Sequence, residues 1–262
     1  MSTSDSLAKQ DGLKRSRAFL LGESVFTSLR VVAGKPLFLP LHFERLRQSA
    51  EWLWPETSSQ LDELFQTISF PEGDGVLRLT LFAMQEGRQL RPSDIPLLHL
   101  DQQFWAGLPV RETPRARLVK CPPRPSEWPS FLKTGDYLAR LVAARHLAAE
   151  EIPLFHVGDT VTEFIHANLL LWDGGSFITP KPGADTLDGV GLRRFRSLCR
   201  HLGIRLLERE VHVTEVKKYR TAFALNAVRG LVPVRALDEC ELVAHPLELK
   251  LTEAFFHEAI DE

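Results

Sequence analysis

The stretch Phe131-Leu132-Lys133-Thr134-Gly135-Asp136-Tyr137 places one lysine on a short apolar run beside a glycine and a tyrosine. Such surroundings can remove water from the amine and favour its neutral form, and neutral lysine attacks aldehydes whereas protonated lysine does not. The heptapeptide therefore indicates an enzyme in which Lys133 reacts with a carbonyl group. Two further blocks, 21–30 and 160–169, are expected to belong to the same site.

Composition limits the classes of protein to consider. The chain has 262 residues, is 44% hydrophobic and carries a formal net charge of −2, which indicates a globular protein of one large or, more plausibly, two smaller domains. Lysine and arginine are scattered, so neither nucleic acid nor an anionic membrane is an expected partner. The sequence shows no apolar run of about 18 residues and no secretory signal, so we expect a cytoplasmic protein.

Cysteine and histidine give no sign of a metal site. The chain has 3 cysteines, Cys121, Cys199 and Cys240, an odd number at wide spacing that fits neither a disulfide framework nor a CxxC site. His201 and His212 lie too far apart for a local zinc motif. We therefore expect no metal and reduced cysteines that serve in packing.

The pattern of apolar residues predicts an α+β fold in two domains. Residues 1–17 have the polar composition of a flexible leader, and residues 18–120 form the predicted small N-terminal domain. It has a strand at 25–32, helices near 41–53 and 59–68, and an antiparallel sheet that includes strands 76–83, 96–100 and 116–121. The proline-rich segment 121–130 is the predicted interdomain loop, because it cannot form a helix or a central strand.

The predicted large C-terminal domain comprises residues 131–262. We expect helices at 136–150, 190–202 and 246–260, and strands at 154–157, 168–172, 176–178, 205–211, 221–226 and 232–237. Asp173-Gly174-Gly175 has the composition of a hairpin turn between two of these strands. The basic residues of helix 190–202 are expected on its solvent side, namely Arg193, Arg194, Arg196 and Arg200.

Amine chemistry at a carbonyl calls for an electron sink, and pyridoxal phosphate is the usual one. Its ring nitrogen would need a carboxylate, for which Glu163 is the candidate. Its phosphate would need a cation and backbone N–H groups, for which Arg45 and the glycine-bounded helix start at 189–191 are candidates. Taken singly these signals are weak, since most glutamates and helical arginines are solvated surface groups.

Taken in order, these segments resemble the class IV aminotransferase family of fold-type IV pyridoxal phosphate enzymes, over about 18–237. By this resemblance Arg45, in His42-Phe43-Glu44-Arg45-Leu46, matches the arginine that binds the phosphate. Lys133 matches the lysine that bonds to the cofactor, and Glu163 matches the carboxylate that faces the ring nitrogen. The remaining expected cofactor contacts are Tyr137, Gly189, Val190, Gly191, Asn226 and Ala227.

The resemblance also implies a fold and an assembly. The expected fold is that of D-amino acid aminotransferase, with a small N-terminal α/β sandwich and a larger C-terminal domain, β-barrel-like with helices. The family is typically homodimeric, and a symmetric dimer is the commonest soluble oligomer. We therefore expect a homodimer acting on a small-molecule substrate.

The first block favours one branch of the family. Phe26-Thr27-Ser28-Leu29-Arg30-Val31 is similar to the FTTARV pattern of aminodeoxychorismate lyase, in which the second threonine is thought to assist proton transfer. Ser28 is therefore the second expected catalytic residue beside Lys133, and Thr27 and Arg30 are expected to contact substrate. The reaction implied is the conversion of 4-amino-4-deoxychorismate to 4-aminobenzoate and pyruvate, a step of folate biosynthesis.

Two alternatives remain open at this point. One is an aminotransferase of the same family that acts on branched-chain or D-amino acids. The other is a binding protein that retains the fold without turnover. The chain departs from the family's patterns at Glu23-Ser24, Asp136 and Leu192, and it lacks the usual opening WxNG strand.

Overall fold

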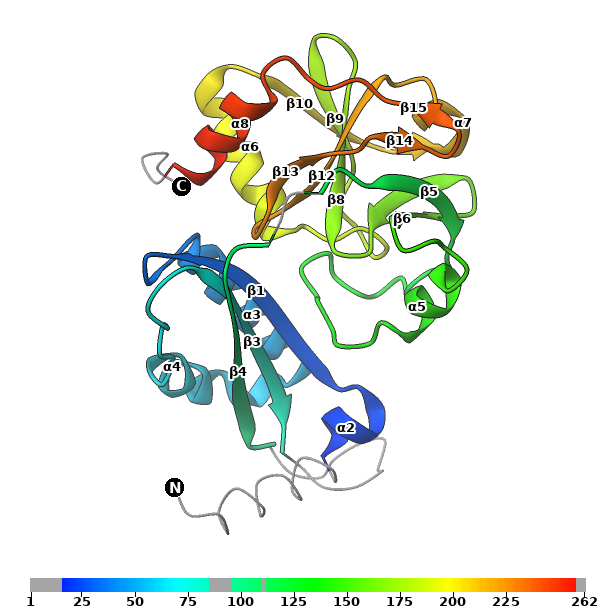
Figure 1. Ribbon diagram of the computed structural model, residues 1–262. Coiled ribbons are helices and arrows are strands. Elements are labelled where there is room, and N and C mark those ends of the chain that lie inside the picture. Colours follow the sequence, from blue (N-terminus) through cyan, green and yellow to red (C-terminus); the bar gives the residue numbers. More distant parts are fainter. Residues whose placement is uncertain (1–15, 85–95, 110–111, 258–262) are drawn as a thin grey trace. The chain divides into compact units, whose positions relative to one another are not determined.

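The computed structural model describes residues 16–84, 96–109 and 112–257, and the chain divides into two units (Figure 1). Unit 1 comprises Met1–Gly107 and Leu132–Tyr137, and unit 2 comprises Leu108–Phe131 and Leu138–Glu262. Most of the predicted leader, residues 1–15, lies outside the described residues. Its last two residues, Ser16 and Arg17, are buried at the start of helix α2 (Arg17–Leu21).

A four-stranded antiparallel sheet of order β2-β1-β3-β4 forms the centre of unit 1. Its strands are β1 (Ser24–Val32), β2 (Lys35–Pro36), β3 (Gly75–Ala83) and β4 (Leu98–Ala106). In β3 the leucines at 77, 79 and 81 are almost fully buried, whereas Val76, Arg78 and Thr80 are partly exposed. Because side chains alternate across a strand, one face of this sheet is an apolar core and the other carries polar groups.

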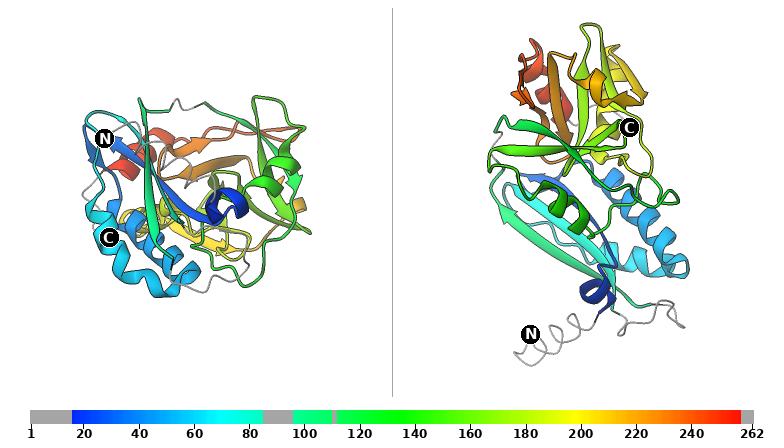
Figure 2. Two further views of the ribbon diagram at one scale, coloured as in Figure 1. Left: turned by 90° about the horizontal axis from the view of Figure 1, so that it is seen from below. Right: turned by 90° about the vertical axis from the view of Figure 1, so that its right-hand side faces the viewer.

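Helices α3 (Leu39–Leu53) and α4 (Ser58–Gln66), joined by the 3₁₀ turn Pro55–Thr57, belong to unit 1 and confirm the two predicted helices (Figure 2). Helix α3 packs on β1 and buries Leu46 and Ala50. Its first turn contains Pro40, where a missing N–H costs nothing, and the chain leaves the helix just before Pro55. This helix places Arg45 against the buried face of the sheet.

Strand β5 (Arg115–Lys120) corrects the predicted organisation. We expected it in the N-terminal antiparallel sheet, but it pairs in parallel with β6 (Glu151–Val157) and β14 (Ala236–Leu237) of unit 2. The chain thus leaves unit 1 at Gly107, not at residue 120, and the irregular segment 121–130 lies within unit 2. The alternation of apolar residues identifies a strand but does not indicate which strand it pairs with, and this explains the error.

The sheet of unit 2 has 11 strands in the order β10-β9-β8-β7-β6-β5-β14-β15, with β11 paired to β7 and with β12 joining β8 to β13. The strands not yet given are β7 (Thr160–Phe164), β8 (Ala167–Trp172), β9 (Ser176–Pro180), β10 (Arg205–Arg209), β11 (Val211–His212), β12 (Thr221–Asn226), β13 (Gly230–Pro233) and β15 (Cys240–Glu241). The predicted hairpin is confirmed, because Asp173 Oδ1 accepts hydrogen bonds from the N–H groups of Gly175 and Ser176 between β8 and β9.

The helices of unit 2 are α5 (Leu138–Ala144), α6 (Val190–Leu202), α7 (Val213–Val216) and α8 (Glu248–Phe256). Helix α6 has the predicted bounds, and the Phe195 ring packs edge-on against Phe177 in the core, with centroids 5.1 Å apart. Helix α5 ends at Ala144 rather than at the predicted residue 150. No helix in the described part of the chain has the length and apolar character needed to cross a membrane.

Arg194 corrects the prediction that the basic residues of α6 all lie in solvent. Its side chain is buried, and its guanidinium donates to the main-chain carbonyls of Phe255 and His257 at the end of α8. The last carbonyls of a helix need donors from outside its own hydrogen-bond ladder, and a buried cation supplies them and complements the negative end of the helix dipole. Arg194 therefore ties the two helices together.

Candidate active site

The segment that carries Lys133 lies along the first strand of unit 1. Phe26 N donates to the Lys133 carbonyl at 3.0 Å, Gly135 N donates to the Ser24 carbonyl at 3.0 Å, and Val25 forms an antiparallel bridge with Thr134. A Cβ at Gly135 would lie 2.4 Å from Ser24 Oγ, so glycine permits this close approach. The main chain around the lysine is thus held by strand-like hydrogen bonds.

The Lys133 side chain is half-buried among aromatic groups. Its Nζ donates to the Tyr137 hydroxyl at 2.9 Å and lies 4.8 Å from the centroid of the Phe26 ring. The Tyr137 and Phe26 rings are themselves 6.0 Å apart. The amine therefore lies near two aromatic rings and the Tyr137 hydroxyl, as expected for a group that must react rather than remain solvated.

Arg78 of β3 belongs to the same cluster and was not singled out by the sequence. Its guanidinium carbon lies 3.6 Å from the centroid of the Phe26 ring, and its Nε donates to Thr80 Oγ1. Burial lowers the pKa of Arg78, while nearby Tyr137 and Asp101 act in the opposite direction. The signal in the sequence is that this arginine alternates with the apolar residues of a predicted strand. Arg78 adds a cation on the same aromatic ring that the Lys133 amine approaches.

The two faces of β1 separate the residues predicted from the first block. Ser28 lies opposite Arg78 in the sheet register, and Phe26, Ser28 and Arg30 share the face on which Lys133 lies. Thr27 points to the other face and is 0% exposed. The structure therefore brings Ser28 and Lys133 to one face of β1 and places Thr27 on the other.

Thr27 instead joins strand β1 to helix α3. Its hydroxyl accepts from Arg45 Nη2 and lies 2.6 Å from His42 Nδ1. His42 is fully buried, and burial, together with the positive charge of Arg45, holds its pKa well below its usual range. Thr27 Oγ1 therefore links a neutral histidine to the buried arginine predicted to bind phosphate, and it orients that arginine.

Thr27→Val tests how much the contacts of the Thr27 hydroxyl contribute to stability. Valine keeps the shape but leaves Arg45 and His42 with one partner fewer in a buried site, and we expect a loss of about 1–3 kcal/mol in the free energy of unfolding. Urea denaturation measures it. Thr67→Val is the matched control at an exposed helix end, where a change within about 0.5 kcal/mol is expected. Equal effects in the two variants would contradict the assignment.

In unit 2, Glu163 is the fourth residue of β7, and its side chain is 3% exposed. Its Oε1 accepts from Arg140 Nη1 at 2.8 Å and its Oε2 accepts from Leu187 N at 2.9 Å. Arg124 Nη2 lies farther away, 3.9 Å from Oε1. The predicted carboxylate is thus a buried, fixed anion whose oxygens each retain a lone pair for a further donor.

The start of helix α6 has the features expected of an anion site. Gly189 is the N-cap residue and no side chain caps this end, so the first N–H groups of a helix of 13 residues keep their hydrogen-bonding capacity. A Cβ at Gly191 would lie 2.6 Å from the Asn226 carbonyl carbon, so the helix start and the chain after β12 are in close contact.

Asn226, the last residue of β12, and Ala227 lie with their main-chain atoms against the start of α6. Asn226 Oδ1 accepts from the N–H groups of Val228 and Arg229, and its Nδ2 donates to the His166 carbonyl. The Asn226 side chain therefore shapes the turn that lies against Gly191. Asn168 acts similarly on the other side, because its Nδ2 donates to the Leu187 carbonyl at 2.8 Å.

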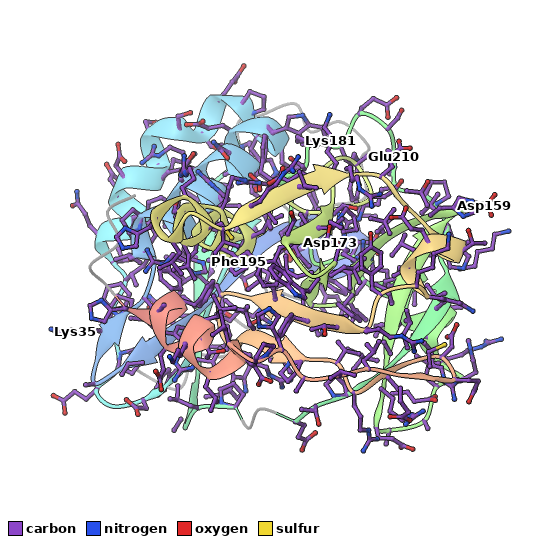
Figure 3. All side chains as sticks on the ribbon, turned by 90° about the horizontal axis from the view of Figure 1, so that it is seen from above. Lys35, Asp159, Asp173, Lys181, Phe195 and Glu210 are labelled. Carbon is purple, nitrogen blue, oxygen red and sulfur yellow. The ribbon has the colours of Figure 1, made fainter. Side chains whose placement is uncertain are left out.

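Unit 2 also has a hollow of about 380 Å³ that includes none of the predicted site residues. Lys181 and Glu210 line it, and Figure 3 shows both near the end of β10. Asp185 and Thr186, from the loop that leads to Leu187, form part of its wall. The loop that supports Glu163 through the Leu187 N–H therefore borders this hollow.

Comparison with known proteins matches the sequence of this chain to a family model. The model described as amino-transferase class IV matches residues 24–237. The chain is 26% identical over 237 residues to aminodeoxychorismate lyase of Bacillus subtilis (strain 168), covering 84% of this chain and 80% of that protein. It is 25% identical over 219 residues to a probable branched-chain-amino-acid aminotransferase of Thermotoga maritima, covering 82% and 78%.

Solved structures share the fold. A 4-amino-4-deoxychorismate lyase from Pseudomonas aeruginosa superposes with a TM-score of 0.76 at 22% identity, over 94% of this chain and 95% of that one. The PLP-bound form of a hypothetical aminotransferase from Mycobacterium tuberculosis gives 0.72 at 18% identity, over 92% and 90%. The predicted α+β fold with two sheets, that of fold-type IV pyridoxal phosphate enzymes, is therefore confirmed.

Proposed function

Because the chain belongs to the class IV aminotransferase family, we propose that it is a pyridoxal phosphate-dependent lyase that converts 4-amino-4-deoxychorismate to 4-aminobenzoate and pyruvate. The observation that carries the choice of lyase is the face of β1 beside Lys133. It presents the hydroxyl of Ser28 and no carboxylate, in a block similar to the lyase pattern. The B. subtilis lyase relative supports it.

The residues present fit the cofactor. A phosphate needs backbone N–H groups, which the start of α6 offers without a side-chain cap, and Gly189 and Gly191 let this helix start lie close to Asn168 and the Asn226 main chain. A protonated ring nitrogen needs a buried anion with a free lone pair, which Glu163 supplies. The aldehyde of the cofactor bonds to a primary amine that has restricted contact with water, and Lys133 supplies such an amine. Arg45 would add the fixed cation for the phosphate.

When bound, pyridoxal phosphate delocalises the electrons released at the substrate carbon that bears the amine. Lys133 Nζ, held by the Tyr137 hydroxyl, is the base that takes the proton from this carbon. Lys133 or Ser28 then delivers a proton to the three-carbon fragment, which leaves as pyruvate while the ring becomes aromatic. Positioned acid–base groups of this kind contribute about 10²–10⁴-fold.

Substrate carboxylates require a positive partner. Arg78 lies on the Phe26 ring, on the same face of the sheet as Ser28 and Lys133. A guanidinium on an aromatic ring is pre-organised and presents a planar set of donors that matches a carboxylate. We propose that Arg78 recognises an anionic substrate, with Arg30 farther along the same face of β1.

The test is product formation from the proposed substrate. Purified protein with pyridoxal phosphate is supplied with chorismate, glutamine and the amidating synthase, and release of 4-aminobenzoate is followed. We expect release to depend on the protein and to fall in Ser28→Ala. Absence of 4-aminobenzoate from folded, cofactor-loaded protein would refute the lyase proposal.

The aminotransferase is the second candidate, favoured by the T. maritima relative at nearly the same identity. Branched-chain or D-amino acids, followed by 2-oxoglutarate, would test it in the same preparation. A transaminase passes the cofactor stoichiometrically through its amine form and regenerates it with the keto acid, whereas the lyase proposal predicts no such exchange. We also propose a homodimer, which light scattering of the purified protein would test.

A further inference from the structure

Arg140 of α5 is a buried cation, and no motif in the sequence singles it out. Its side chain is 8% exposed and donates from Nη1 to Glu163 Oε1 at 2.8 Å. Its Nη2 donates to the Asp185 carbonyl, and its guanidinium carbon lies 5.3 Å from the centroid of the Phe155 ring. Two strands of unit 2, β6 and β7, and the loop that contains Asp185 thus fix this one guanidinium.

The burial of α5 is the reverse of that of an ordinary amphipathic helix. Arg140 points inward, whereas Leu138, Leu141 and Val142 are 69%, 56% and 49% exposed. The helix lies beside β5, as Figure 1 shows. The inward side of α5 therefore carries Arg140, paired with Glu163, together with the small residues Ala143 and Ala144, which pack against the core around Phe155.

Such a pair is a poor source of stability, because removing two charges from water costs about as much as their attraction returns. Its effect on geometry is larger. Arg140 holds Oε1 and the Leu187 N–H holds Oε2, so the plane of the Glu163 carboxylate is fixed from both sides. A carboxylate with one lone pair left on each oxygen, in a fixed plane, is suited to a single further N–H donor.

We propose that Arg140 is a positioning residue that orients Glu163 toward the protonated ring nitrogen of the cofactor. The inference rests on the proposed use of pyridoxal phosphate, but it is independent of whether the reaction is elimination or transamination. The other charged groups near the pair are Arg124 and Asp185. Asp185 Oδ1 accepts from the Arg124 N–H, and the Arg124 guanidinium is the more distant cation, so Arg124 is the matched control.

The experiment is a double-mutant cycle read out by cofactor binding. The variants are Arg140→Met, Glu163→Gln, their combination and Arg124→Met, each titrated with pyridoxal phosphate and followed by absorbance. The second readout is the ¹⁵N chemical shift of the ring nitrogen in labelled, bound cofactor, which reports whether that nitrogen carries a proton.

We expect Arg140→Met to weaken cofactor binding by about tenfold, the usual effect of losing a hydrogen bond to a charged group. Its ¹⁵N shift should move toward the unprotonated ring. Arg124→Met should change affinity less than about twofold, since its contact is long. In the Glu163→Gln background, removal of Arg140 should have no further effect, because the carboxylate through which it acts is gone.

Each outcome decides between two readings. Additive effects of Arg140→Met and Glu163→Gln, or an unchanged ¹⁵N shift in Arg140→Met with only a lower melting temperature, would overturn the proposal in favour of a structural role. If Arg140→Met alone does not fold, the comparison is made between Glu163→Gln and the double variant, because neither contains an unpaired buried glutamate. Unequal affinities of these two variants for pyridoxal phosphate would contradict the proposal. Wild-type protein that binds no pyridoxal phosphate would refute the proposed function instead.

Discussion

Lys133→Ala is expected to abolish turnover and to remove the visible absorbance that covalently bound pyridoxal phosphate gives. The lysine amine is the only group of the Phe26–Tyr137 cluster that can bond to an aldehyde, and the loss of acid–base help alone is worth about 10²–10⁴-fold. The measurement combines an absorbance spectrum of the cofactor-incubated protein with the product assay.

The control is Lys35→Ala, which removes an exposed lysine of the same unit. It should leave both the spectrum and the rate unchanged. If Lys133→Ala keeps the visible band and a substitution of another lysine removes it, that other lysine bonds to the cofactor. The assignment of Lys133 would then be wrong.

Gly191→Ala is expected to have the second largest effect. The new Cβ would lie 2.6 Å from the Asn226 carbonyl carbon and 2.8 Å from Ala227 N, and both are main-chain atoms that cannot rotate away. Either the start of α6 or the turn after β12 must shift, at a cost of about 1–3 kcal/mol in the free energy of unfolding. Because the same N–H groups are proposed to bind the phosphate, cofactor affinity should fall by about tenfold or more.

Gly183→Ala is the matched substitution, since a Cβ there meets no atom within 4 Å. Thermal denaturation and cofactor titration of the two variants provide the comparison. We expect a clear loss in both measurements for Gly191→Ala and almost none for Gly183→Ala. Similar values for the two glycines would show that the close approach at the helix start has no role in binding.

The regular elements were largely predictable from local pattern. Helix α6 has the predicted bounds, because an apolar stripe with glycines at both ends specifies a helix without reference to the rest of the chain. The hairpin at Asp173 follows equally from turn chemistry. Strand β5 was predicted as a strand but placed in the wrong sheet, since pairing depends on contacts between distant residues.

The sequence indicated candidate site residues, but it did not indicate which residues surround them. Local pattern indicated Lys133, but no pattern within 136–150 shows that Arg140 would be buried and the leucines exposed. Arg140 is buried against Glu163, a residue that is distant in sequence. Thr27 and Ser28 are likewise neighbours of similar chemistry, and only the pairing of β1 with β3 decides which of them shares a face with the lysine.

The path of the chain through the two units limits how the protein can be divided into fragments. Residues Leu132–Tyr137 belong to unit 1 although the segments on either side belong to unit 2. A fragment starting at residue 108 would contain Lys133 without the strand whose N–H at Phe26 holds its carbonyl, and a fragment ending at residue 107 would contain that strand without the lysine. Activity should therefore require both pieces together, as in a complementation experiment with co-expressed halves.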